Sequence, residues 1–199
     1  MRILSFLLFG LILYGCTEKV EQYVPNQYTI EQFYQNSRIG GGAFSDDETK
    51  LLVSSDESGI FNVYEITIAD GSKKQITFSE KESFFAVDYV PGTGQILYSA
   101  DKGGNEISHI YLLGNDDESK DLTPGENEKA NFAGWSDDKQ FMYYLSNKRD
   151  DRFFDLYKMS ISDWSSELIY QNDDGLDISD MSKDENLYTL TKTITTSSN

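Results

Sequence analysis

From about residue 39 onward, the chain alternates short apolar runs with clusters of polar turn residues. Residues 141–146 and 154–159 are two such runs, and Ser136-Asp137-Asp138 precedes the first of them. The runs are rich in Val, Ile, Tyr and Phe and are interrupted every few residues by Asp, Gly and Ser, which is typical of β-strands joined by turns. The pattern therefore predicts strands rather than helices throughout this region.

The same pattern returns at a fixed period. The large residue that ends the first predicted strand of each unit recurs in steps of 45, 46 and 46 residues, at Phe44, Tyr89, Trp135 and Met181. A tyrosine in the third predicted strand recurs in steps of 47 and 46, at Tyr64, Tyr111 and Tyr157. A period of about 46 residues with three or four short strands is the length of a propeller blade. We therefore predict an all-β fold: an incomplete β-propeller of three blades and the start of a fourth.

Each predicted blade follows one plan. A short first strand with small residues lies innermost, and a turn leads to the second strand. In the first, third and fourth units it is a turn of Ser and Asp, whose side chains bond backbone amides two residues on, and in the second unit Pro91-Gly92-Thr93-Gly94 takes its place. The second strands are residues 51–54, 96–99, 141–146 and 187–191, and fourth strands are predicted at 74–78 and 167–170. The predicted blades span about 39–81, 82–127 and 128–172, with a partial blade at 173–199.

The N-terminal residues predict a secretory signal. A basic start is followed by an apolar run of 11 residues, 3–13, which is too short for a permanent membrane span. The sequence Leu13-Tyr14-Gly15-Cys16 resembles a bacterial lipobox, so we predict a lipoprotein signal peptide at 1–15 and lipidation of Cys16. The alternative is an ordinary signal with an incidental cysteine. Residues 16–28 are predicted to be a tether, followed by a short helix capped by Thr29.

Composition limits the partners of the chain. Its 199 residues are 38% hydrophobic and 14% aromatic, which is enough to build a core, and its net charge is −17. Phosphate contacts need clustered Lys and Arg. The charge therefore argues against nucleic acid or an anionic lipid surface as a partner.

His109 is the one histidine in the sequence, so any general base or triad would depend on it. It lies two residues before a third-strand tyrosine, in the position that Asn62 and Asp155 occupy in the other units. Three hydrogen-bonding side chains in one repeat position favour a structural role over a catalytic one.

Two kinds of charged cluster are candidates for ligand binding. Acidic pairs could suggest calcium, but they lack the spacing of a calcium loop and fall in predicted turns, so we favour turn chemistry. A basic cluster on the loop after residue 146 could contact an anion, but a solvated loop is the simpler interpretation. The acidic pairs are Asp46-Asp47, Asp116-Asp117, Asp137-Asp138 and Asp173-Asp174, and the basic residues are Lys148, Arg149 and Arg152.

The sequence contains no Gly-x-Ser-x-Gly elbow, Walker loop or His-Glu-x-x-His motif. Cys16 has no second cysteine with which to form a disulfide or a thiolate metal site. We therefore predict no catalytic residue, no cofactor and no metal ligand in this chain.

The unit Trp135-Ser136-Asp137-Asp138, followed by an apolar strand and Leu156-Tyr157, resembles the TolB-like propeller repeat. Together with the predicted lipoprotein signal and the stretches 28–33 and 172–175, it resembles the N-terminal part of bacterial prolyl oligopeptidase-family serine peptidases of the dipeptidyl and acylaminoacyl type. In that family a propeller filters peptides ahead of an α/β-hydrolase domain that carries the Ser, Asp and His.

The resemblance implies a substrate-gating propeller part of a peptidase that acts on peptides, in a chain truncated before its catalytic domain and inactive alone. The alternative is a TolB-like envelope lipoprotein that binds a protein partner without catalysis. Either protein would be held in the bacterial cell envelope through a lipid on Cys16, with a peptide or protein bound by the propeller.

Overall fold

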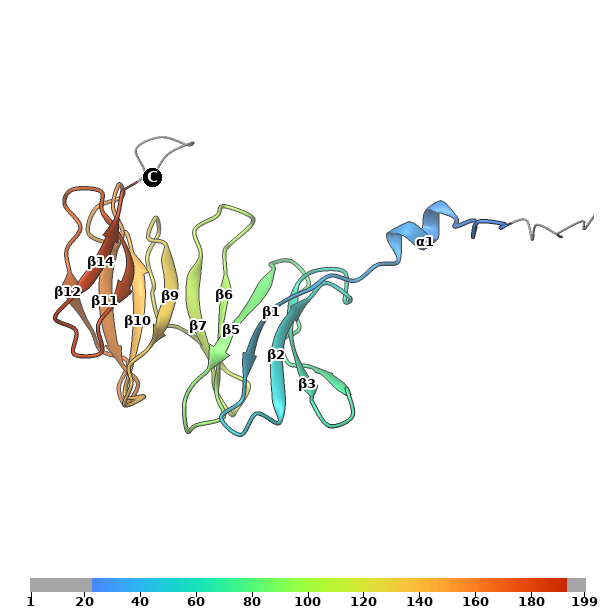
Figure 1. The fold of residues 1–199 in the computed structure, drawn as a ribbon, viewed down its shortest axis with the longest axis horizontal. Coiled ribbons are helices and arrows are strands. Elements are labelled where there is room, and N and C mark those ends of the chain that lie inside the picture. Colours follow the sequence, from blue (N-terminus) through green and yellow to red (C-terminus); the bar gives the residue numbers. More distant parts are fainter. Residues whose placement is uncertain (1–22, 193–199) are drawn as a thin grey trace, which may run out of the picture. The chain divides into compact units, whose positions relative to one another are not determined.

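The computed structural model describes residues 23–192, and the chain divides into two units, residues 1–36 and 37–199. In the first unit, helix α1 (Ile30–Tyr34) begins after the predicted cap (Figure 1). The N–H of Gln32 donates to Oγ1 of Thr29, and the N–H of Thr29 donates to Oε1 of Gln32 at 2.8 Å. This reciprocal pair satisfies two N–H groups that a helix start leaves free.

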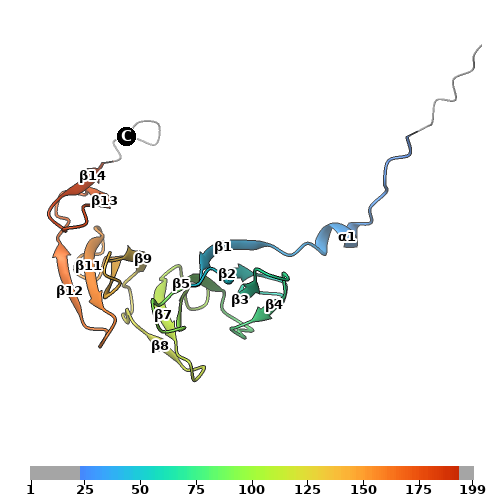
Figure 2. The ribbon, with the colours of Figure 1, turned by 60° about the horizontal axis from the view of Figure 1, so that its bottom comes forward.

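The second unit is built of antiparallel sheets that follow one another in sequence order (Figures 1 and 2). Each of the first three sheets has its four strands in chain order, and we call these sheets blades 1, 2 and 3. Blade 1 contains β1 (Ile39–Phe44), β2 (Lys50–Ser55), β3 (Asn62–Thr67) and β4 (Lys73–Gln75). Blade 2 contains β5 (Phe84–Tyr89), β6 (Ile96–Ala100), β7 (His109–Leu113) and β8 (Ser119–Asp121). Blade 3 contains β9 (Ala130–Trp135), β10 (Phe141–Ser146), β11 (Asp155–Ser160) and β12 (Ser166–Tyr170).

A fourth, two-stranded sheet pairs β13 (Asp177–Met181) with β14 (Tyr188–Thr191). These two strands match the first and second strands of a further unit. The predicted fold class is therefore confirmed: the described part of the chain is an all-β, incomplete propeller of three blades and two further strands.

The turn between first and second strands repeats almost atom for atom in blades 1 and 3 and in the β13–β14 hairpin. In blade 3, Oγ of Ser136 donates to Asp138 at 2.6 Å, and the N–H of Phe141 donates to Oγ of Ser136 at 3.0 Å. Asp138 also accepts the N–H of Gln140 at 3.0 Å, the contact two residues on that the sequence predicts. Lys139 closes the turn with φ 59°.

Each first strand also carries one extra residue relative to its neighbour. The pairing skips Val87 in β5, Ala133 in β9 and Ser179 in β13, at intervals of 46 residues, and β1 shifts register between Gly40 and Ala43. Such bulges bend a strand and increase its twist. They therefore curve the first strand of every blade at the same place, a feature that the apolar pattern does not reveal.

The apolar core lies between the blades. Blades 1 and 2 enclose a cluster that includes Leu52, Val63 and Tyr98, while blades 2 and 3 enclose a second one around Leu97, Met142 and other buried residues. Burying a side chain of this size stabilises the fold by roughly 1.5–3 kcal/mol. Neighbouring blades stabilise each other because each of these clusters contains apolar side chains from two blades.

Candidate functional site

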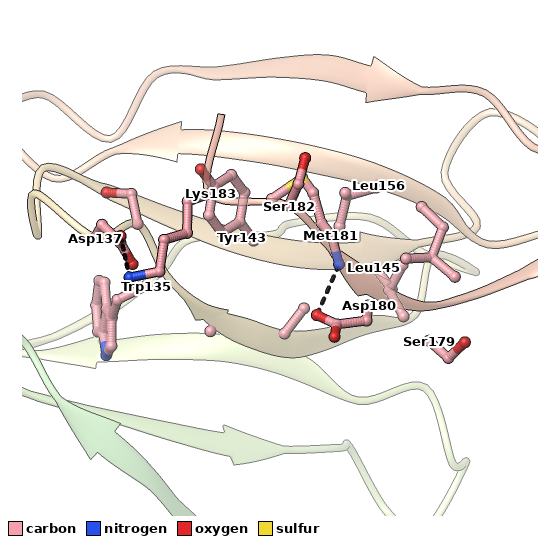
Figure 3. A pocket seen from close by; sticks show the side chains of 14 residues that line it. Trp135, Asp137, Tyr143, Leu145, Leu156, Ser179, Asp180, Met181, Ser182 and Lys183 are labelled. Carbon is pink, nitrogen blue, oxygen red and sulfur yellow. Dashed lines mark hydrogen bonds and ion pairs between the residues drawn. The ribbon is translucent and has the colours of Figure 1, made fainter. Parts of the chain in front are cut away.

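The pocket shown in Figure 3 lies between blade 3 and the β13–β14 hairpin and has a volume of about 240 Å³. Its walls come from the first strands β9 and β13 and from β10 and β11. Trp135, Leu145, Leu156 and Met181 supply apolar surface, and Asp180 contributes a carboxylate. That carboxylate accepts the N–H of Met181 at 2.8 Å.

Ion pairs tie the two sides of this pocket together. Nζ of Lys183 lies 2.8 Å from Asp137 across the pocket mouth (Figure 3). Behind it, Glu185 accepts hydrogen bonds from Lys158 and from the hydroxyl of Tyr143, both at 2.6 Å. The bonds from Lys158 and Tyr143 lower the pKa of Glu185, while burial and the nearby carboxylate raise the pKa of the Tyr143 hydroxyl.

These contacts define what the pocket can do. Its lysine and the glutamate behind it already have partners, and Tyr143 is held protonated at neutral pH. The volume is below the roughly 300–1,000 Å³ of most ligand pockets. Asp180 and the apolar walls could contact a small group such as one side chain or a terminal amine. The arrangement is therefore suited to binding rather than to bond breaking.

The structure places His109 away from that pocket, at the start of β7. Its side chain is buried, and Nδ1 lies 2.7 Å from Oδ2 of Asp121 on β8. Within residues 23–192, the buried Nε2 has no hydrogen-bond partner. The pair fastens the third strand of blade 2 to its fourth.

The equivalent residues in the other two blades also hold the chain that follows the third strand, but they do so by accepting a backbone N–H. Asn62 accepts the N–H of Ser79 at 2.8 Å, and Asp155 accepts the N–H of Asn172 at 2.8 Å. Both acceptors are fully buried. The position therefore fastens the chain that leaves each of these blades to the start of its third strand, which is the structural role that the repeat predicts.

The residues of the basic cluster contact groups of their own blade, acids for the two arginines and an aromatic ring for the lysine. Arg149 binds the buried carboxylate of Asp155 through two nitrogens, at 2.7 and 2.9 Å, and Arg152 lies 2.6 Å from Asp150. Nζ of Lys148 lies 3.9 Å from the ring centre of Tyr157. All three cationic side chains therefore contact groups of blade 3, and a bound anion would have to compete with these partners.

The acidic pairs lie where turns were predicted. Asp47 and Asp138 close the repeated turns, and Asp46 accepts the N–H of Gly92 at 2.7 Å from the next blade. No group of three His, Cys, Asp or Glu side chains within residues 23–192 could hold a metal ion. Cys16 lies outside the described residues, so its lipidation stays a prediction. In the described part of the chain, no helix has the length and apolarity to span a bilayer.

Sequence reasoning missed the polar contacts between blades, among them one made by a tryptophan. Nε1 of Trp135 donates to Asp88 on β5 at 3.0 Å, joining the first strands of blades 2 and 3. Burial raises the pKa of the Asp88 carboxyl, although the indole donor opposes that shift. The two residues are 47 apart, and Trp135 is the repeat equivalent of Tyr89 and not of Asp88, so the repeat pattern does not signal this contact.

Comparisons with known proteins agree with this architecture. No protein-family model matches the sequence. Over 122 residues the chain is 32% identical to dipeptidyl aminopeptidase BIII of Pseudoxanthomonas mexicana, a match that covers 58% of this chain and 17% of that protein. The chain therefore spans about a sixth of the length of this curated relative.

Solved structures with the same fold include proteins of different activity. TolB from Acinetobacter baumannii matches 80% of this chain and 39% of its own, with TM-score 0.59 and 18% identity. Dipeptidyl peptidase 4 of Porphyromonas gingivalis matches 68% of this chain and 20% of its own, with TM-score 0.51 and 19% identity. An oligogalacturonate lyase matches 77% of this chain and 46% of its own, with TM-score 0.60 and 12% identity.

At such low identities the structural likeness establishes the fold and leaves the activity open. The resemblance inferred from the sequence is confirmed at that level: the chain is a TolB-like propeller portion similar to those of prolyl oligopeptidase-family peptidases and of TolB.

Proposed function

We propose that this chain is the substrate-gating and substrate-binding propeller part of a prolyl oligopeptidase-like serine peptidase that acts on peptides. The observation that carries the proposal is the 32% identity with dipeptidyl aminopeptidase BIII over 122 residues. The other likenesses are at lower identity and concern the fold. A pocket that suits binding more than bond breaking agrees with a part that admits or holds peptides while other residues cleave them.

In this proposal the catalytic Ser, Asp and His belong to an α/β-hydrolase domain of the whole protein. His109 would not join them, because its Nε2, the nitrogen left to act as a base when Nδ1 is bonded to Asp121, is buried away from any proton donor of residues 23–192. A general base must reach the proton that it removes, directly or through one water. The contribution of the propeller is then to restrict access to the hydrolase site and to contact the peptide.

The second candidate is a TolB-like envelope protein that binds a protein partner. It is favoured by the extent of the structural match, since TolB from Acinetobacter baumannii aligns with 80% of this chain. Both candidates share the proposed anchor, a lipid on Cys16 that would hold the protein in the bacterial cell envelope. Radiolabelled palmitate should enter the wild-type protein in the native bacterium and should not enter the Cys16→Ala variant.

The coding sequence that follows the codon for Asn199 separates the two candidates. Further blades and a hydrolase domain with a Gly-x-Ser-x-Gly elbow support the peptidase, and the encoded protein should then hydrolyse dipeptidyl nitroanilides. Replacement of the elbow serine by alanine should abolish that hydrolysis, while replacement of His109 by alanine should leave the catalytic serine reactive towards a fluorophosphonate. Further blades with no hydrolase domain would overturn the peptidase proposal in favour of the binding protein.

A further inference from the structure

A second cavity lies at the outer side of the boundary between blades 1 and 2. It is a groove of about 440 Å³ between β4 and the chain after it on one side and the β7–β8 hairpin on the other. Ile76, Phe78, Phe84 and Leu113 give it an apolar lining, and Asp117 lies at the tip of the hairpin. We call it the blade 1–2 groove. Its volume lies within the roughly 300–1,000 Å³ of ligand pockets.

The β11–β12 hairpin of the next blade is one residue longer, and it also closes on a left-handed residue, with a different side chain. Asp117 and Trp164 both adopt a left-handed conformation, with φ 63° and 61°. The N–H of Asp117 donates to the carbonyl of Gly114, and that of Trp164 donates to the carbonyl of Ser160. Asp117 and Trp164 each lie two residues before the first residue of the fourth strand, so they correspond when the two hairpins are aligned from that strand.

In blade 3 this tryptophan covers the equivalent boundary. Trp164 packs against the cluster between blades 2 and 3. Three residues that line the groove lie one repeat, 46 residues, before members of that cluster. The pairs are Ile76 and Leu122, Phe84 and Ala130, and Leu113 and Met159. The cluster member of each pair is at most 7% exposed.

The groove therefore has an apolar lining like that of the cluster against which Trp164 packs, but no tryptophan of this chain lines it. Phe78 adds to its apolar surface and is 75% exposed. We propose that the blade 1–2 groove binds a partner peptide that inserts one aromatic side chain and carries a basic residue beside it.

The net charge of the chain favours a basic residue beside the aromatic residue of the bound peptide. Asp117 and Lys74 lie on opposite sides of the groove, so their charges oppose each other locally. The sign is then set by the whole chain, whose net charge of −17 attracts cations and repels anions. An aromatic residue next to Lys or Arg fits this environment better than one next to Glu.

The probes for the test are acetyl-Lys-Trp-amide, acetyl-Glu-Trp-amide and acetyl-Lys-Ala-amide, added to purified protein with ¹³C-labelled Ile and Leu methyl groups. We expect acetyl-Lys-Trp-amide to shift the methyl resonances of Ile76 and Leu113. At low ionic strength it should bind a few-fold more tightly than acetyl-Glu-Trp-amide, and acetyl-Lys-Ala-amide should leave both resonances in place. Shifts confined to other methyl groups, or equal binding of the Lys and Glu probes, would overturn the proposal.

Asp117→Trp places in the β7–β8 hairpin the residue type found at Trp164, and it is the most decisive variant for this test. It should raise the melting temperature and weaken acetyl-Lys-Trp-amide binding by at least about tenfold, a loss of about 1.4 kcal/mol. Phe78→Ala, at an exposed position that need not affect folding, should weaken binding several-fold. The matched control is Phe44→Ala, because Phe44 is 60% exposed and lies outside the groove. Unchanged probe affinity in both groove variants would show that the groove is not the site.

Discussion

Blades 1 and 3 share a backbone plan, yet they fasten their third strands with different chemistry. In blade 1 the neutral amide of Asn62 accepts from Thr77 and from the N–H of Ser79, at 3.0 and 2.8 Å. In blade 3 the carboxylate of Asp155 accepts from Arg149 and from the N–H of Asn172. In both cases the backbone donor lies 17 residues after the acceptor.

The comparison shows what the repeat requires. A buried backbone N–H must find an acceptor, because leaving it unpaired costs free energy. The acceptor can be an amide or a carboxylate, provided that a carboxylate brings its own counterion. Arg149, on the loop before β11, meets that condition for Asp155. In blades 1 and 3 the repeat therefore fixes the position of the acceptor and leaves its charge free to vary.

The largest effect should come from removing the acceptor in blade 3. Asp155→Ala removes the buried carboxylate that binds Arg149 and accepts the N–H of Asn172, and it leaves Arg149 with the exposed Asp173 as its acidic partner. Unfolding should therefore become easier by about 3–5 kcal/mol. Asn62→Ala removes a neutral acceptor and should cost about 1–3 kcal/mol. Urea unfolding of the two variants and the wild type measures both losses. Equal losses would mean that the charge of Asp155 adds nothing to its role.

The boundaries that blades 1 and 3 form with blade 2 offer a second matched pair. Leu52 and Leu97 occupy equivalent positions in second strands, and both are 0% exposed. Replacing either by alanine should cost about 2–5 kcal/mol. The larger loss is expected for Leu97, because its cluster is covered by Trp164 whereas the boundary of blades 1 and 2 carries the blade 1–2 groove. A larger loss for Leu52 in urea unfolding would contradict this ranking.

Much of the fold could be predicted from the sequence because large apolar residues and turn residues recur at the repeat spacing. The second and third strands and the Ser-Asp turn at Ser136 follow from that pattern. Strand β8 does not, since Ser119-Lys120-Asp121 is polar and becomes a strand only by pairing with β7. The bulge at Ala133 is hidden for a similar reason, because it depends on register with β10.

The candidate site was harder to predict than the fold. The structural role of His109 followed from comparing repeat positions, and the pairing of Arg149 with Asp155 did not, because a loop must fold back over six residues to make it. The blade 1–2 groove depends on which residue occupies the tip of a hairpin. Asp117 and Trp164 are 47 residues apart, one more than the repeat of 46, so the sequence alone did not align them.

A smaller effect is expected from the lysines that cover the third-strand tyrosines. Nζ of Lys148 in blade 3 lies 3.9 Å from the ring centre of Tyr157, whereas Nζ of Lys73 in blade 1 lies 5.5 Å from that of Tyr64. Cation–π contacts at exposed sites contribute about 0.5–1 kcal/mol. Lys148→Met should therefore destabilise the protein more than Lys73→Met, by a few tenths of a kcal/mol, in a comparison of urea midpoints. The reverse order would show that the ion pair of Lys73 with Glu57 outweighs ring contact.

The smallest effect concerns the turn that blades 1 and 3 have in common. Hydrogen bonds from Ser45 and Thr49 lower the pKa of Asp47 from 3.8 to about 2. Bonds from Ser136 and the N–H of Gln140 likewise lower the pKa of Asp138. A carboxyl whose pKa is lower in the folded state contributes stability above its unfolded pKa and loses it as the pH falls through the folded value. For Asp47 that window runs from about pH 4 down to about pH 2.

Ser45→Ala and Ser136→Ala test whether this turn is equivalent in the two blades. Each variant removes the largest cause of the shift, so the pKa of Asp47 or Asp138 should rise towards its ordinary value. Carboxyl ¹³C titration by NMR measures this directly, and urea midpoints between pH 2 and 5 should lose part of their acid dependence. Because the turns are exposed, the change in stability should be small even where the titration shift is clear. An unchanged Asp47 titration in Ser45→Ala would mean that the hydroxyl and the backbone N–H of Thr49, and not the serine, hold the pKa of Asp47 low.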